Sequence, residues 1–265
     1  MTVTCDARGG PATRWYGPVL ENRAYLEMAR LLADPVLRNR GVAAGDGRAV
    51  LLLPGFLAGD STLWLLAKFL RQIGYRPTFS GIAFNSGCAR SYQRRMVDAV
   101  RHAREQSGRQ IAIVGHSRGG HYAKSIAAAC PEDVSHVVCL GTGLDTALDV
   151  HRMTGLGAAV SRSLLATPGS NRQTSGCLTD RCACSLQRSY RKPLPATLHL
   201  TSIYSRGDGL VRWQSCLADY ATCVEVPGSH IGLAFNRHAY RAVAHALAMP
   251  AARSEPAPSQ RTCAS

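Results

Sequence analysis

Apolar segments recur at regular intervals between residues 48 and 248, and turn residues follow most of them. The clearest run, 49–53, has no polar alternation and stops at a Pro-Gly turn, as is typical of a strand buried on both faces of a parallel sheet. Strands are predicted at 49–53, 76–83, 110–114, 136–140, 197–203 and 222–226. The pattern therefore predicts a sheet of six strands.

Segments with helical spacing lie between these strands. From Leu20 to Leu32 apolar residues recur every three or four positions, which predicts a helix that packs on the domain ahead of the sheet and ends before Pro35. Further helices are predicted at 61–73, 91–106, 118–129, 210–218 and 236–248. Helices that alternate with strands predict an α/β fold, in which a mostly parallel sheet is covered by helices on both faces.

The alternation stops for about fifty residues after position 143, where Pro, Gly, Ser and three cysteines accumulate. A segment of this kind inside a domain is usually functional, so we expect residues 145–192 to form a lid. We divide the chain into an N-terminal helical extension (1–47), one α/β domain that contains the lid (48–248) and a Pro/Ala/Ser-rich, disordered tail (249–265).

Residues 115–119 read Gly-His-Ser-Arg-Gly, directly after the predicted strand 110–114 and at the start of a predicted helix. A strand, a sharp turn and a helix are the context in which G-x-S-x-G forms a nucleophile elbow, with Ser117 as the nucleophile. Two further motifs follow strands in the order that such a triad requires: Tyr-Ser-Arg-Gly-Asp, ending at Asp208, and Gly-Ser-His, ending at His230.

The chemistry requires residues of these types. A serine hydroxyl is a weak nucleophile at its ordinary pKa, so Ser117 needs a base, and His230 can serve once Asp208 holds its other ring nitrogen. Asp145 is the alternative acid, because it follows the preceding strand.

On these motifs, together with the Leu-Pro-Gly-Phe turn at 53–56 and Gly-Ser-His-Ile-Gly at 228–232, the chain resembles the α/β-hydrolase superfamily. Within it, the last two motifs are similar to those of lidded bacterial lipases and esterases of an actinobacterial type. The resemblance spans roughly residues 48–248. Two positions depart from it: Pro54 stands where many lipases have His, and Arg118 stands where a small or apolar residue is common.

The resemblance implies a serine hydrolase that cleaves carboxylic esters through an acyl-enzyme. It also implies that the backbone N–H groups of Phe56 and Arg118 form the oxyanion hole, and that Phe56, Leu57, His116 and Arg118 line the substrate site. The substrate would be a small or lipid-like acyl ester, and no motif implies a metal or an organic cofactor. Two alternatives remain: a thioesterase or acyltransferase acting on coenzyme A- or carrier-bound acyl groups, and a non-catalytic binding module with a hydrolase fold.

The formal net charge of +14 does not indicate nucleic-acid binding, because the arginines are spread along the chain and no nucleic-acid motif accompanies them. The charge suits an anionic partner, such as an acidic carrier protein or a lipid surface. No apolar stretch is long enough to span a membrane, and no signal peptide is evident at the N-terminus, so we expect a cytoplasmic protein.

Ten cysteines are many for a reducing compartment. Cys130 and Cys139 lie in apolar helix and strand contexts, where buried free thiols are expected. The cluster of Cys177, Cys182 and Cys184 lacks a fourth ligand for zinc, which leaves disulfides or free thiols. The best candidate pair for a disulfide is Cys216 with Cys223, and free thiols are the alternative.

Overall fold

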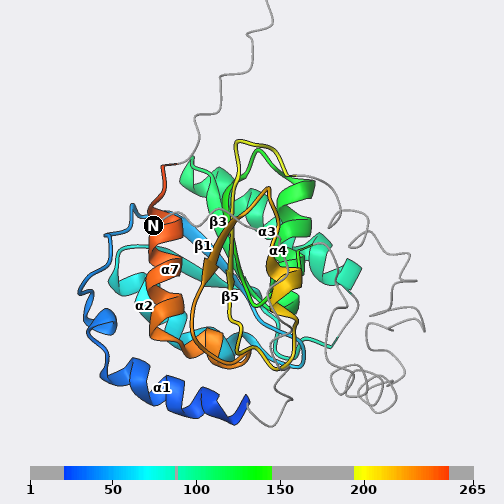
Figure 1. Ribbon diagram of the computed structural model, residues 1–265. Coiled ribbons are helices and arrows are strands. Elements are labelled where there is room, and N and C mark those ends of the chain that lie inside the picture. Colours follow the sequence, from blue (N-terminus) through cyan, green and yellow to red (C-terminus); the bar gives the residue numbers. More distant parts are fainter. Residues whose placement is uncertain (1–20, 87–88, 145–193, 251–265) are drawn as a thin grey trace, which may run out of the picture.

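The computed structural model describes residues 21–86, 89–144 and 194–250. In this part of the chain six parallel strands form one sheet in the order β2-β1-β3-β4-β5-β6 (Figure 1). The strands are β1 Ala49–Leu53, β2 Arg76–Phe79, β3 Ile111–His116, β4 Val134–Leu140, β5 His199–Tyr204 and β6 Thr222–Glu225. This confirms the predicted α/β class and its parallel sheet.

Helices cover both faces of the sheet. The α-helices are α1 Arg23–Ala33, α2 Trp64–Gln72, α3 Ala89–Ser107, α4 Arg118–Ala129 and α7 Arg237–Ala248. Short 3-10 helices lie at η2 Pro35–Arg38, η3 Asp60–Leu63, η4 Trp213–Cys216 and η5 Gly232–Phe235. Helices α1, α2 and α7 lie on one face, and α3 and α4 lie on the other (Figure 1).

The alternation of side chains along each strand produces two cores. Leu52 of β1 and Val114 of β3 point into the core under α2 and α7, whereas their neighbours Leu51 and Ile113 point into the core under α3 and α4. Because successive side chains of a strand point to opposite faces, a strand between two helical layers must be apolar at every position. This is the physical reason for the uninterrupted runs in the sequence.

Two predicted elements are only about half as long in the structure. The helix predicted at 210–218 is only η4, because Asp208 Oδ1 accepts hydrogen bonds from the N–H groups of Leu210 (2.8 Å) and Val211 (2.7 Å) and holds the chain in a turn. The strand predicted at 76–83 ends at Phe79, because Asp60 Oδ2 accepts from the N–H groups that follow it, at 81 (2.7 Å) and 82 (3.1 Å).

None of the four cysteines that the structure describes, Cys130, Cys139, Cys216 and Cys223, forms a disulfide, and all four are buried. The first two were predicted so, but the suggested disulfide between Cys216 and Cys223 is wrong. Burial raises the pKa of the Cys216 thiol well above its usual range, so this sulfur behaves as a small apolar group. Cys177, Cys182 and Cys184 lie outside the described residues, as do the predicted lid and residues 251–265 of the predicted tail.

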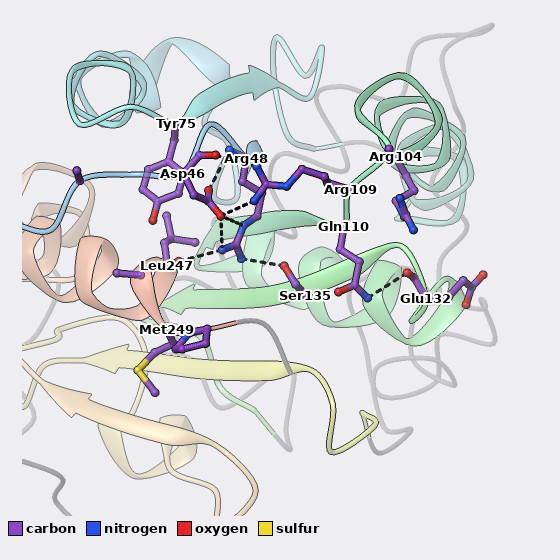
Figure 2. A pocket seen from close by; sticks show the side chains of 14 residues that line it. Asp46, Arg48, Tyr75, Arg104, Arg109, Gln110, Glu132, Ser135, Leu247 and Met249 are labelled. Atoms are coloured by element: carbon purple, nitrogen blue, oxygen red, sulfur yellow. Dashed lines mark hydrogen bonds and ion pairs between the residues drawn. The ribbon is translucent and has the colours of Figure 1, made fainter. Parts of the chain in front are cut away.

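At the amino ends of the strands a buried arginine joins the sheet to the C-terminal helix (Figure 2). Arg48 donates to Asp46 Oδ2, to Ser135 Oγ (2.9 Å), to His136 Nδ1 and to the Leu247 carbonyl oxygen at the end of α7. Burial, with Arg48 beside it, lowers the pKa of His136 to about 3, so this imidazole is neutral and accepts from the guanidinium. A cavity of about 460 Å³ lies over this cluster.

We expect Arg48→Ala to lower the free energy of unfolding by about 2 to 4 kcal/mol, because it leaves buried acceptors at Ser135 and His136 without their donor. Arg109→Ala is the matched control. It removes an exposed guanidinium from the same Asp46 carboxylate and is expected to change the free energy by about 0 to 1 kcal/mol. Urea denaturation measures both, and equal losses would contradict the assignment of Arg48 as the buried link.

Candidate active site

Ser117 lies in the tight turn between β3 and α4. Its φ of 53° is in the left-handed region that non-glycine residues rarely adopt. The backbone is held there from the neighbouring strand: the Ser117 N–H donates to the Leu140 carbonyl oxygen (2.8 Å), and the Ser117 carbonyl accepts from Thr142 Oγ1 (2.9 Å). This is the strained, over-determined backbone expected of a nucleophile elbow.

The two glycines of the motif are required by close backbone contacts. A Cβ at Gly119 would lie 2.1 Å from the Leu53 carbonyl oxygen of β1, and a Cβ at Gly115 would lie 2.4 Å from the backbone of Gly119. Only residues without a side chain allow α4 to approach the strands this closely. The spacing that the sequence shows is therefore a consequence of packing around Ser117.

Asp208 and His230 are brought together by the loops after β5 and β6. The Nδ1 of His230 donates to Asp208 Oδ2 over 2.6 Å, and both side chains are buried. The other carboxylate oxygen of Asp208 accepts the two backbone N–H groups of the turn at 210 and 211, which fixes its orientation. The structure thus joins the two residues that the sequence predicted as acid and base, whereas Asp145 lies outside the described residues.

The environment of His230 favours its protonated form. Burial alone would lower the pKa of His230, but the Asp208 carboxylate, through its charge and its hydrogen bond, and the charge of Glu21 raise the pKa above its ordinary value of 6.5. An imidazole stabilised as the cation in this way is suited to accept a proton and later return it.

His116 lies against His230, with their ring centroids 5.1 Å apart. Its Nε2 donates to the His230 carbonyl oxygen (2.9 Å), which fixes the backbone of the histidine loop. Burial, and then the charge of His230, lower the pKa of His116 to about 4, so it is neutral near pH 7. The structure therefore places His116 as a support for His230, and its contact with substrate stays a prediction.

The loop after β1, which carries Phe56 and Leu57, is held by Asn85. The Leu57 N–H donates to the Asn85 carbonyl oxygen (3.1 Å), and Asn85 Nδ2 donates to the carbonyl oxygen of Pro54 (2.8 Å). Leu57 has a φ of 57°, so this loop is also strained. Asn85 is fully buried, and sequence reasoning missed it because the loop atoms that it holds are backbone atoms 28 and 31 residues away.

The Arg118 guanidinium is buried beneath the same loop. It donates to the Asn85 carbonyl oxygen (3.2 Å) and lies 5.6 Å from the ring centroid of Phe56 and 5.4 Å from that of Tyr122. These contacts tie the start of α4 to the Phe56 loop, so the two backbone N–H groups predicted as the oxyanion hole belong to one connected assembly. Sequence reasoning placed this side chain in the substrate site, which stays a prediction.

Ser117, Asp208 and His230 all follow the carboxyl ends of strands, at the edge where parallel α/β sheets bind their ligands. The cavity over Arg48 lies at the opposite edge (Figure 2). Among the described residues, no group of three or more His, Cys, Asp and Glu side chains is placed to hold a metal ion.

We expect Asp208→Asn to lower the pKa of His230, because the carboxylate that stabilises the imidazolium is removed while burial remains. An NMR titration of the imidazole measures this. Asp145→Asn is the control for the alternative acid and is expected to leave the pKa unchanged. A larger effect of Asp145→Asn than of Asp208→Asn would contradict the assignment of the acid.

Comparison with models of protein families finds no match, and a search of curated protein sequences finds no significantly similar one. Solved structures do match. A mature lipase of Bacillus licheniformis is 14% identical with a TM-score of 0.58, over 78% of this chain and 95% of its own. A thioesterase domain from the curacin biosynthetic pathway is 16% identical with a TM-score of 0.53, over 77% of this chain and 92% of its own.

A monoacylglycerol lipase of Paleococcus ferrophilus is 15% identical with a TM-score of 0.50, over 78% of this chain and 96% of its own. At this level of identity the likeness concerns the fold. The parallel sheet, the strained serine between β3 and α4, and the acid and histidine after β5 and β6 agree with it. The chain therefore has the α/β-hydrolase fold.

Proposed function

We propose that the protein is a serine hydrolase of carboxylic esters, with Ser117 as nucleophile, His230 as general base and Asp208 as the residue that orients the base. The observation that carries the proposal is the buried hydrogen bond between Asp208 and His230, in a fold where Ser117 occupies the strained elbow after β3. A carboxylate, an imidazole that it orients and a serine hydroxyl are the three groups that this kind of acyl transfer requires.

In the proposed mechanism, the Ser117 hydroxyl oxygen attacks the ester carbonyl carbon while His230 Nε2 accepts its proton. The negative charge that develops on the carbonyl oxygen is stabilised by the backbone N–H groups of Phe56 and Arg118 and by the N-terminal end of α4. His230 then gives its proton to the departing alcohol. Water, activated by the same imidazole, releases the acyl group from Ser117 and restores the enzyme.

The side chains next to the site residues support an apolar acyl substrate. Leu57, Phe84 and Ile231 are 37%, 46% and 44% exposed, and each is adjacent in sequence to a residue of the site or its supports, Phe56, Asn85 or His230. Exposed apolar side chains of this size are suited to contact with a hydrocarbon chain. A lipid-like acyl ester is thus the proposed substrate class.

A thioesterase or acyltransferase is the second candidate, and the observation that favours it is the net charge of +14. A basic surface attracts the phosphates of coenzyme A or an acidic carrier protein. p-Nitrophenyl esters of graded chain length, assayed beside acyl-coenzyme A thioesters, distinguish the two. A preference for the thioester that weakens as salt is added would favour the second candidate.

We expect Ser117→Ala and His230→Ala each to lower kcat for an ester substrate by about 10³-fold or more, because the triad acts as a unit. A fluorophosphonate probe is expected to label the wild type at Ser117, and Ser117→Ala is expected to stay unlabelled. Circular dichroism checks that the fold is retained. A wild type that the probe does not label at Ser117 would leave only the binding-module alternative.

We expect Asn85→Ala to lower kcat by roughly 10-fold or more, because the loop that presents the Phe56 N–H loses the hydrogen bond from Asn85 Nδ2 to Pro54. KM is expected to change less than kcat, since the oxyanion forms after substrate binds. Gln110→Ala is the control, because it removes an exposed amide that also donates to a backbone carbonyl. A change confined to KM would contradict the role of Asn85 in the oxyanion loop.

A further inference from the structure

A second buried carboxylate, that of Glu21, lies directly behind the loops that carry Asp208 and His230. Glu21 precedes α1 in the chain, and its side chain is almost completely buried. Its Oε1 accepts from the N–H groups of Gly209 (2.9 Å) and His230 (3.1 Å), and its Oε2 accepts from the N–H of Ile231 (2.7 Å). The Glu21 carboxylate therefore bridges Gly209, the residue after Asp208, and His230 itself.

These contacts connect segments that are far apart in sequence. The partners of Glu21 lie 188 to 210 residues further along the chain. Burying a carboxylate is costly unless donors surround it, and here three backbone N–H groups do so. A glutamine at this position would present an N–H₂ group to at least one of these donors, so the arrangement specifically suits a carboxylate.

Two neighbours on α1 extend the contact. Glu27 accepts from the Ser229 N–H (2.8 Å) and from Asn236 Nδ2 (2.9 Å), and Arg23 donates to the Gly207 carbonyl oxygen (2.8 Å). Both loops of the site thus rest on the first turns of α1. Among these side chains only Glu21 bonds the backbone of His230 itself.

We propose, resting on the proposed function, that Glu21 is a positioning residue: its buried carboxylate fixes the loops of Asp208 and His230 relative to each other and stabilises the charge that His230 acquires as base. The charged and titratable groups that face His230 are Asp208 from the loop after β5, His116 from β3 and Glu21 from before α1. Asp208 orients the ring through Nδ1, His116 bonds the carbonyl, and Glu21 bonds the N–H.

The charge of Glu21 distinguishes this role from simple support of the loop. It raises the pKa of His230, in the same direction as Asp208 and against burial. Loss of the charge at Glu21 therefore lowers the pH at which His230 becomes protonated. Since the base must be neutral to accept the serine proton, the acid limb of the pH profile moves to lower pH with it. Glu27 supports the same loop, but it is not among the groups that shift the pKa of His230. Glu27 is therefore a matched control.

The test compares Glu21→Gln with Glu27→Gln by NMR titration of the His230 imidazole, in a Ser117→Ala background. Because this readout needs no turnover, it is separate from the probe labelling that tests the proposed function. Glu21→Gln is expected to lower the His230 pKa, whereas Glu27→Gln is expected to keep it at the parent value. An unchanged pKa in Glu21→Gln, or an equal decrease in both variants, would overturn the proposal.

In the protein that retains Ser117, Glu21→Gln is expected to lower kcat by about 10-fold or more and to change KM less. The acid limb of its pH profile is expected to lie at lower pH. A change in KM alone would contradict a role in positioning the base. Glu21→Asp serves where the Gln variant does not fold. Aspartate retains the negative charge but is one methylene shorter, so its carboxylate lies further from the loops. The expected result is a smaller decrease of the His230 pKa than in Glu21→Gln, with faster amide exchange at Gly209 and Ile231. A Glu21→Asp variant with the parent His230 pKa and the parent exchange rates at these two amides would overturn the proposal.

Discussion

Two buried carboxylates contact His230: Asp208 bonds its ring and Glu21 bonds its backbone N–H. The loops at the carboxyl ends of the strands are arranged to satisfy both. A carboxylate removed from water needs hydrogen-bond donors at both oxygens. Here most of those donors are backbone N–H groups, in the turn after Asp208 and in the segment around His230. The shape of the two loops is therefore set by the requirement to solvate buried negative charge, and the orientation of the imidazole follows from it.

The part of the candidate site around Phe56 and Ser117 is held by different interactions, but on the same principle. The Phe56 loop has strained backbone at Leu57, and the elbow has strained backbone at Ser117. Each conformation persists because buried polar groups from another element hold it: Asn85 for the loop, and Leu140 with Thr142 for the elbow. Arg118 joins the two, since it contacts both the Asn85 carbonyl and the Phe56 ring.

The two ends of the strands carry different polar clusters. At the amino ends, Arg48, which directly precedes β1, joins β4 and the end of α7 through buried hydrogen bonds. At the carboxyl edge, the same strands end in the loops of the site. No helix in the described part of the chain is long and apolar enough to cross a membrane.

The sequence by itself determined the strands, the elbow and the chain order of Ser117, Asp208 and His230, because each depends on local patterns: apolar runs, glycine spacing and turns after strands. Where a side chain captured backbone groups, the local pattern was misleading: Asp208 shortened the helix predicted at 210–218. Only the tertiary structure decided that Cys216 and Cys223 form no disulfide and that Asn85 and Glu21 hold the loops of the candidate site. The loop atoms that Asn85 and Glu21 hold are backbone atoms distant in sequence, and a backbone N–H or carbonyl leaves no residue-specific signal in the sequence.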